Sequence, residues 1–208
     1  NIAGTFPNVE FFFDHRCTDV DLNNPTITFE DLKTNEFKTV EAPLIFATDG
    51  AFSAVRNVLQ RTDRFNYRQF YLDHGYKELT IPATADGNFA MEVNALHIWP
   101  RKDYMLIALP NLDKTFTCTL FFPFEGEASF DKLKTETDVK NFFEKTFPDA
   151  VPLMPDYINE FFTNPTSSLV TVKCFPWIRE DKFALIGDAA HAIVPFFGQG
   201  MNCGFEDC

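Results

Sequence analysis

Apolar and polar positions alternate over short stretches in the first part of the chain. Residues 9–13, 26–30 and 37–41 combine aromatic or β-branched side chains with polar neighbours, which is typical of short strands. Turn-forming residues at 33–36 separate the second stretch from the third. We therefore predict three short strands here, the last two of which are joined as a hairpin.

Two continuous apolar runs differ from this alternating pattern. Residues 44–48 and 183–187 are apolar almost throughout, and an acidic residue, Asp49 or Asp188, follows each run. Such runs are typical of strands that are covered on both faces in an α/β sheet. After the first run, residues 53–59 predict a short helix with Ser53 as its N-cap.

The segment between the two runs has the pattern of an antiparallel sheet with helices. Met105, Ile107 and Leu109 alternate with Leu106 and Ala108, which predicts an apolar row on one sheet face. Helices are predicted at residues 139–146 and 156–162. Strands are predicted at residues 69–72, 77–81, 91–99, 104–109, 116–122 and 169–175.

These elements predict a mixed α/β fold in which an antiparallel sheet is inserted into an α/β layer. Residues 1–66 and 176–208 would form the layer, and residues 67–175 would form the insertion. The chain opens at Asn1 without a methionine, and residues 201–208 have the pattern of a helix start. We expect the chain to be a fragment.

Composition limits the classes of function. With 208 residues the chain can form one domain or parts of two, and 26 phenylalanines suggest broad aromatic packing or an apolar pocket. A formal charge of −12 argues against binding to nucleic acid or to anionic membrane surfaces. The sequence shows no secretory signal and no apolar run of about 18 residues that would span a membrane.

Metal and thiol chemistry are poorly supported. The chain has no HExxH or CxxC motif, and His15, His74, His97 and His191 are far apart, so we predict no metal site. His97 and His191 adjoin apolar residues, which favours packing or capping over general-base catalysis. The odd number of scattered cysteines favours a reduced, intracellular compartment; they are Cys17, Cys118, Cys174, Cys203 and Cys208.

The segment from Leu185 to Cys208 is the strongest candidate for chemistry. Asp188 stands at the carboxyl end of a predicted strand, where open α/β sheets bind ligands, and a carboxylate there can accept hydrogen bonds from ribose or ribityl hydroxyls. The alternative is that Asp188 caps a helix that begins at Ala189. Residues 198–202 form a glycine-bearing turn that leads into a helix, which suits an anionic group, although a plain tight turn has the same pattern.

A second candidate is Asp49-Gly50, which follows the first apolar run. Asp-Gly after a strand is more often an ordinary turn than a binding site. Arg56 follows Ser53 by about one helical turn and could reach an anion, but a solvated arginine is the default interpretation.

Taken together, these motifs resemble those of the class A FAD-dependent aromatic hydroxylases. The residues Thr48-Asp49-Gly50 and Leu185-Ile186-Gly187-Asp188 are similar to the two downstream flavin motifs of that group. Within it, residues 97–101, 106–111, 116–121 and 189–202 resemble the kynurenine 3-monooxygenase family. The similarity extends from about Ala42 to Cys208.

The resemblance implies an NADPH- and FAD-dependent monooxygenase that hydroxylates L-kynurenine to 3-hydroxykynurenine with O2, through a flavin hydroperoxide. It places the enzyme in tryptophan catabolism and pyridine nucleotide biosynthesis. The mitochondrial outer membrane is the implied location, through a C-terminal anchor that this sequence does not contain. The GxGxxG unit for the ADP half of FAD and the arginine and tyrosine for the substrate carboxylate are also absent from it.

The resemblance also assigns residues. An FAD-binding portion with a Rossmann-like layer would comprise residues 1–66 and 176–208, and a substrate domain would comprise residues 67–175. No catalytic residue is assigned. The substrate would contact Leu96, Met105, Ile107, Leu109, Phe121, Pro195, Phe196 and Gln199. The cofactor would contact Asp49, Gly50, Arg56, Gly187, Asp188, Pro195, Gly198, Gly200, Met201 and Asn202.

Two other functions stay open from the sequence. One is a class A hydroxylase acting on a different phenol or polycycle. The other is a non-catalytic flavin-fold protein or interaction module, in which the assigned residues would simply be core between sheet and helices.

Overall fold

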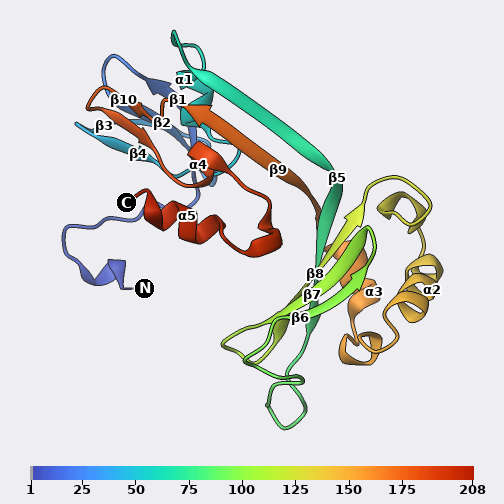
Figure 1. Ribbon diagram of the computed structural model, residues 1–208. Coiled ribbons are helices and arrows are strands. Elements are labelled where there is room, and N and C mark those ends of the chain that lie inside the picture. The colour runs from blue at the N-terminus through green and yellow to red at the C-terminus, as the bar shows by residue number, and fades with distance from the viewer. Residues whose placement is uncertain (1) are drawn as a thin grey trace. The chain divides into compact units, whose positions relative to one another are not determined.

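The computed structural model describes residues 2–208 and divides the chain into two compact units (Figure 1). One unit comprises the chain up to Phe70 together with Val170–Cys208, and the other comprises Tyr71–Leu169. Two long strands, β5 and β9, contain both boundaries; β5 spans Asn66–Ile81 and β9 spans Thr166–Phe175.

The first unit contains two small sheets. An antiparallel sheet has the strand order β1-β2-β3, and a mixed sheet has the order β10-β11-β4, in which β11 and β4 are parallel. The parallel pair is formed by the two continuous apolar runs. The expectation that both faces are covered is wrong for β4, where Ile45 and Ala47 are buried but Phe46, on the other face, is 59% exposed. The strands are β1 His15–Asp21, β2 Thr26–Asp31, β3 Phe37–Glu41, β4 Ile45–Ala47, β10 Ile178–Arg179 and β11 Phe183–Leu185.

Three short helices pack in this unit: α1 Ala54–Leu59, α4 Asp188–His191 and α5 Gly200–Glu206. Ser53 caps α1 as predicted, because its Oγ accepts a hydrogen bond of 2.9 Å from the Arg56 amide. The buried cluster that joins sheet and helices consists of Val20, Ile45, Ala47, Val55, Leu59, Phe183, Leu185, Ala189 and Ala190.

The second unit is built on a five-stranded sheet with the order β6-β7-β8-β5-β9. Its adjacent pairs β6·β7, β7·β8 and β5·β8 are antiparallel. The further strands are β6 His97–Arg101, β7 Tyr104–Pro110 and β8 Phe116–Pro123, and the helices are α2 Glu136–Thr146 and α3 Tyr157–Thr163. Thr135 and Asp138 form a capping box at the start of α2.

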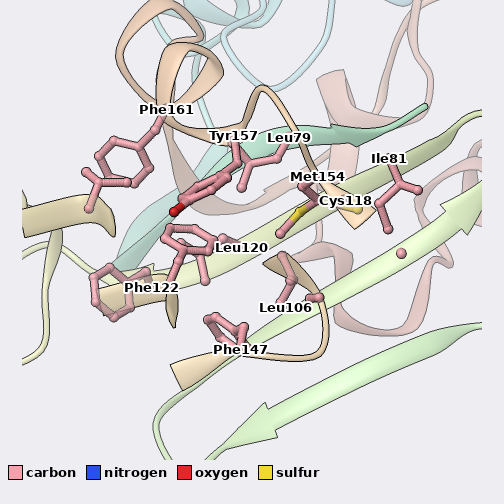
Figure 2. Packing of buried hydrophobic residues seen from close by; sticks show 14 of the residues in the cluster. Leu79, Ile81, Leu106, Cys118, Leu120, Phe122, Phe147, Met154, Tyr157 and Phe161 are labelled. Atoms are coloured by element: carbon pink, nitrogen blue, oxygen red, sulfur yellow. The ribbon is translucent and has the colours of Figure 1, made fainter. Parts of the chain in front are cut away.

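Aliphatic side chains of the sheet pack with aromatic side chains from the sheet and from both helices in the core of this unit (Figure 2). Phe122 of β8 packs edge to face against Tyr104 with ring centroids 5.0 Å apart, and Phe143 of α2 lies 5.0 Å from the ring of Tyr157 of α3. Rings in these arrangements stabilise a core beyond the area that they bury. Many of the phenylalanines therefore serve packing between sheet and helices.

Polar side chains of α3 and its C-cap fasten that helix to β5. Glu160 accepts a hydrogen bond of 2.8 Å from the Thr80 amide, and Asn164 donates one of 2.8 Å to the Glu78 carbonyl. The buried Lys77 donates from Nζ to the Asn164 carbonyl at 2.6 Å. The backbone groups of Glu78 and Thr80 that face away from β8 are thereby paired.

The predicted fold class is confirmed, but three element predictions are wrong. Residues 9–13 form no strand; they pair with no strand within residues 2–208, and Phe11 and Phe13 stack on each other instead. Within residues 91–99, only the part from His97 onward is a strand, because the Asn94 amide donates a local hydrogen bond to the Glu92 carboxylate. The stretches at 69–72 and 77–81 belong to one uninterrupted strand, β5.

Candidate functional site

The first candidate motif is a fixed turn at the carboxyl end of β4. Oδ2 of Asp49 accepts hydrogen bonds from the amides of Ala54 and Val55, at 2.7 and 3.3 Å. Gly50 has φ +78°, a left-handed conformation that favours glycine. One edge of the Asp49 carboxylate thus holds the first turn of α1, while the side chain stays exposed.

Arg56 is buried rather than solvated, which corrects the default interpretation. The residue is 1% exposed, and its guanidinium donates from Nη1 to the Ala189 carbonyl and from Nη2 to the Ala51 carbonyl, at 2.8 and 2.6 Å. It also lies over the ring of Tyr67, 5.1 Å from the centroid. Two of its N–H groups therefore connect the Asp-Gly turn with α4.

The second candidate motif follows the neighbouring parallel strand. Leu185 of β11 is paired with Ala47 of β4, and the Ile186 amide donates to the Ala47 carbonyl at 3.0 Å. Because both strands run in the same direction, Asp49 and Asp188 follow at the same edge of the sheet, where open α/β sheets bind ligands. The sequence prediction that both acids stand at strand ends is confirmed in this geometry.

Gly187 adopts φ +61° and is the N-cap of α4, whose first residue is the exposed Asp188. The alternative interpretation, in which Asp188 caps a helix beginning at Ala189, is wrong, because the helix already includes Asp188 and Gly187 stands at the N-cap. The Asp188 carboxylate therefore makes no capping bond and faces solvent.

The loop between α4 and α5 combines a tight backbone turn with exposed apolar side chains. Pro195–Phe197 form a 3-10 turn, Gly198 follows with φ +62°, and α5 begins at Gly200. Exposed side chains of this segment include Phe196, Phe197 and Met201, at 40%, 87% and 70%. The Gln199 side chain donates to the Phe197 carbonyl and accepts from Asn202, at 3.1 and 2.9 Å.

Helix α5 approaches the Gly-Asp turn at two glycines. A Cβ on Gly204 would lie 3.5 Å from Cα of Gly187, and a Cβ on Gly200 would lie 3.9 Å from Oδ1 of Asp188. Asp207 closes the contact, because its carboxylate accepts from the Gly187 amide at 2.7 Å and from Nε2 of His191 at 2.8 Å. Partial burial acts to raise the pKa of the Asp207 carboxyl, but these hydrogen bonds lower it below its ordinary value.

A planar, hydroxylated and anionic cofactor fits these residues. Asp188 offers an exposed acceptor at a strand end, and Gly187 and Gly198, which have positive φ, leave the backbone open to close approach together with Gly200, which has no side chain. Within residues 2–208 no cluster of three or more His, Cys, Asp or Glu side chains is arranged to hold a metal ion. All five cysteines are free thiols.

The second unit carries the predicted apolar row. Met105 and Ile107 are half-buried and Leu109 is 49% exposed, whereas the alternating Leu106 and Ala108 are fully buried beneath the helices. Phe121 is the cross-strand partner of Met105 and so shares its face, at 3% exposure. Met105, Ile107, Leu109 and Phe121 therefore lie on the sheet face opposite the helices, while Leu96 precedes β6 and is 51% exposed.

The predicted site residues thus form two groups within their own units. The two strand-end motifs, Arg56 and the loop from Pro195 to Asn202 belong to the first unit. The apolar row and Leu96 belong to the second.

Against this geometry, the family described as FAD binding domain matches residues 3–208. The chain belongs to the FAD binding domain family. The motifs at the ends of β4 and β11 are thus parts of an FAD-binding domain.

Relatives within this FAD-binding family are similar over almost the whole chain. The kynurenine 3-monooxygenase of Flavobacterium johnsoniae is 56% identical over 198 residues, 95% of this chain and 44% of its own length. That of Dictyostelium discoideum is 54% identical over 200 residues, 96% of this chain and 43% of its own length. The chain therefore spans less than half the length of these curated relatives.

Solved structures share the fold of this FAD-binding chain. The tetrameric form of 2-methyl-3-hydroxypyridine-5-carboxylic acid oxygenase has a TM-score of 0.67 at 24% identity, covering 91% of this chain and 48% of its own. The tetracycline destructase Tet(51) has a TM-score of 0.55 at 18% identity, covering 91% of this chain and 49% of its own. At these identities the similarity concerns the fold alone.

Sequence reasoning missed the part played by His191 and Asp207. The two residues stand 16 positions apart, a spacing that carries no periodic signal, and the apolar residues after His191 suggested packing. Only the return of α5 onto the Gly187 turn brings them together.

Proposed function

We propose that the chain is part of a monooxygenase that uses FAD, NADPH and O2 to hydroxylate L-kynurenine to 3-hydroxykynurenine. The observation that carries the proposal is the pair of strand-end motifs at Asp49 and Asp188, in a chain 56% identical to a kynurenine 3-monooxygenase. The substrate is a small aromatic molecule, and kynurenine is the specific assignment.

The first unit would hold the cofactor. Asp188 would accept hydrogen bonds from hydroxyl groups of the flavin's sugar chain, and the amides after Asp49 and Gly50 would lie toward its pyrophosphate. The backbone of Gly200, Met201 and Asn202 would face the ring. Bound FAD supplies the chemistry of oxygen activation, with electrons from NADPH.

Arg56 would act on the cofactor site through the backbone of the two motif turns and would not contact the cofactor itself. Its guanidinium is buried, and two of its donors already bond backbone carbonyls of the two motif segments. We therefore assign it to holding both turns in place.

The second unit, residues 71–169, would contribute the substrate wall. Leu96, Met105, Ile107, Leu109 and Phe121 would contact the aromatic ring of the substrate. An apolar wall of this kind excludes water, which protects reactive oxygen species at a flavin from wasteful decay. In the first unit, Pro195 and Phe196 would contact the substrate, and Gln199 would exchange its bond with the Phe197 carbonyl for one to the polar end of the substrate.

Product analysis tests this proposal. The full-length protein is incubated with FAD, NADPH, oxygen and L-kynurenine, and 3-hydroxykynurenine is quantified by mass spectrometry beside NADPH consumption. We expect product in step with NADPH, and strong loss of product in Gln199→Ala and Phe196→Ala. Leu112→Ala, at a fully exposed side chain of the second unit, is the matched control and should leave turnover unchanged.

Other outcomes separate the alternatives. NADPH consumption with release of hydrogen peroxide alone would indicate a flavin hydroxylase with a different aromatic substrate. No flavin-dependent oxidation with any aromatic substrate of a panel would indicate a non-catalytic FAD-binding protein.

Location follows from the family resemblance. No helix within residues 2–208 is both long and apolar enough to cross a membrane. We propose that the full-length protein resides at the mitochondrial outer membrane, and recovery of the protein in another fraction after organelle fractionation would contradict this.

A further inference from the structure

Asp207 joins both ends of α4. One carboxylate oxygen accepts from the Gly187 amide at the N-cap, and both oxygens lie within 2.9 Å of Nε2 of His191, the last residue of the helix. Because an ionised carboxylate only accepts, Nε2 must carry the proton of the imidazole. Hydrogen bonds to an ionised acceptor are stronger than neutral ones, so the connection is a firm one.

The same carboxylate also anchors α5. Asp207 follows the last residue of α5, and the backbone of that helix lies directly on the turn at the contact between Gly187 and Gly204. At the other end of α5, Gly200 lies beside the Asp188 carboxylate. A displacement of Asp207 would therefore shift the first turn of α5 relative to Asp188.

Trp177 also contacts the imidazole of His191. Its ring lies 4.9 Å from that of His191, its Nε1 donates to the Cys174 carbonyl at 2.7 Å, and its carbonyl accepts from the Leu185 amide at 2.8 Å. The imidazole thus lies beside a side chain whose backbone is bonded to β11. None of these contacts uses the face of Asp188 that is open to solvent.

We propose that His191 and Asp207 are positioning residues of the cofactor site. Together they fix the separation between the Gly187–Asp188 turn and the first turn of α5, and this separation sets the affinity for FAD. The inference rests on the proposed binding of FAD by these two segments. It assigns to the pair no contact with substrate and no proton transfer.

The test measures FAD affinity of the full-length apoprotein by quenching of flavin fluorescence, with the melting temperature of each apoprotein recorded in parallel. His191→Leu removes the donor and should weaken FAD binding by about tenfold, the effect of losing one charge-assisted hydrogen bond. His191→Gln retains an N–H donor and should recover most of the affinity. Asp207→Asn retains an acceptor for only one of the two donors, so its FAD affinity should lie between those of His191→Leu and His191→Gln.

A matched control comes from a second histidine–aspartate pair in the same unit. On the antiparallel sheet, Nε2 of His15 lies 4.0 Å from Oδ2 of Asp31. The variant His15→Leu should leave FAD affinity unchanged. The visible spectrum of the bound flavin gives an independent readout, which should shift in His191→Leu and return in His191→Gln.

Three results would overturn the inference. One is wild-type FAD affinity in His191→Leu. Another is equal loss in the Leu and Gln variants that follows the melting temperature with an unaltered flavin spectrum, since that describes a purely structural role. If the unaltered protein fails to bind FAD, the proposed function falls as well, which distinguishes that failure from the other two.

Discussion

The guanidinium of Arg56 donates a hydrogen bond of 2.8 Å to the carbonyl oxygen of Ala189, 133 residues further along the chain. The same group donates to the Ala51 carbonyl at 2.6 Å. A planar fork with several fixed donors can span two carbonyls in this way, whereas a lysine ammonium presents a single point charge. The two motif turns of the FAD-binding unit are therefore joined through one buried side chain.

Replacing Arg56 should destabilise the first unit. Arg56→Met leaves the Ala51 and Ala189 carbonyls without these donors, and we expect a loss of about 2–4 kcal/mol in the free energy of unfolding. Urea denaturation monitored by circular dichroism measures this. Arg68→Met, at an exposed position over the ring of Phe70, is the control and should change stability by less than about 0.5 kcal/mol. Equal stability of both variants would contradict the structural role of Arg56.

Lys77 occupies a core position without a carboxylate partner among the described residues. Its side chain is 4% exposed on the face shared with Leu79 and Ile81, and burial lowers the pKa of its ammonium from the ordinary value of 10.5. Lys77→Met should therefore be neutral or stabilising at pH 7, by up to about 2 kcal/mol, since an apolar chain of similar length avoids burying a charge.

The pH dependence of this effect has a defined sign. Between the lowered pKa and 10.5 the unfolded chain binds more protons than the folded one, so wild-type stability rises with pH in that window. The advantage of Lys77→Met should accordingly shrink as pH approaches 10.5, as measured by chemical denaturation from pH 7 to 10.5. Lys134→Met, at an exposed ion pair, should show little effect. The ammonium of Lys77 also lies 5.2 Å from the centroid of the Phe161 ring. A variant that is less stable at every pH would mean that this contact and the bond to the Asn164 carbonyl outweigh the cost of burial.

Gly75 is a position where β5 tolerates no side chain. A Cβ there would lie 2.5 Å from the Phe124 ring and 2.7 Å from the Ser167 carbonyl oxygen, and the second atom is backbone that cannot turn away. Gly75→Ala should lower stability by about 2 kcal/mol or more, as thermal unfolding would show. In Gly204→Ala the new Cβ would lie at an ordinary contact distance of 3.5 Å from Cα of Gly187, so this variant should lose less stability. The reverse order would show that the second unit relaxes around Gly75.

Cys118 should be unreactive in the folded protein. Burial raises the pKa of its thiol to about 12, so almost no thiolate exists at pH 9. Treatment with iodoacetamide at pH 9 followed by peptide mass spectrometry should leave Cys118 unmodified, and the same treatment in urea should alkylate it. Rapid alkylation without denaturant would mean that the sheet opens at β8.

The sequence predicted what local pattern controls. The continuous apolar runs before Asp49 and Asp188 predicted two strands of an α/β layer, and the alternation around Leu106 predicted two faces of β7. The prediction failed where tertiary partners decide, as at residues 9–13, which have strand-like composition but find no pairing strand in the part of the chain that the structure describes. The burial of Arg56 and the pairing of His191 with Asp207 depend on segments distant in sequence, and no spacing rule indicates them.

The attachment of α3 to β5 also has a consequence for the solution behaviour of the protein. The outward amide of Thr80 and carbonyl of Glu78 would otherwise form an open strand edge, onto which a strand of another molecule can add. Glu160 and Asn164 occupy these groups and put a carboxylate beside them, which disfavours such addition. Glu160 and Asn164 therefore protect this part of β5 from strand addition, an effect that does not depend on catalysis.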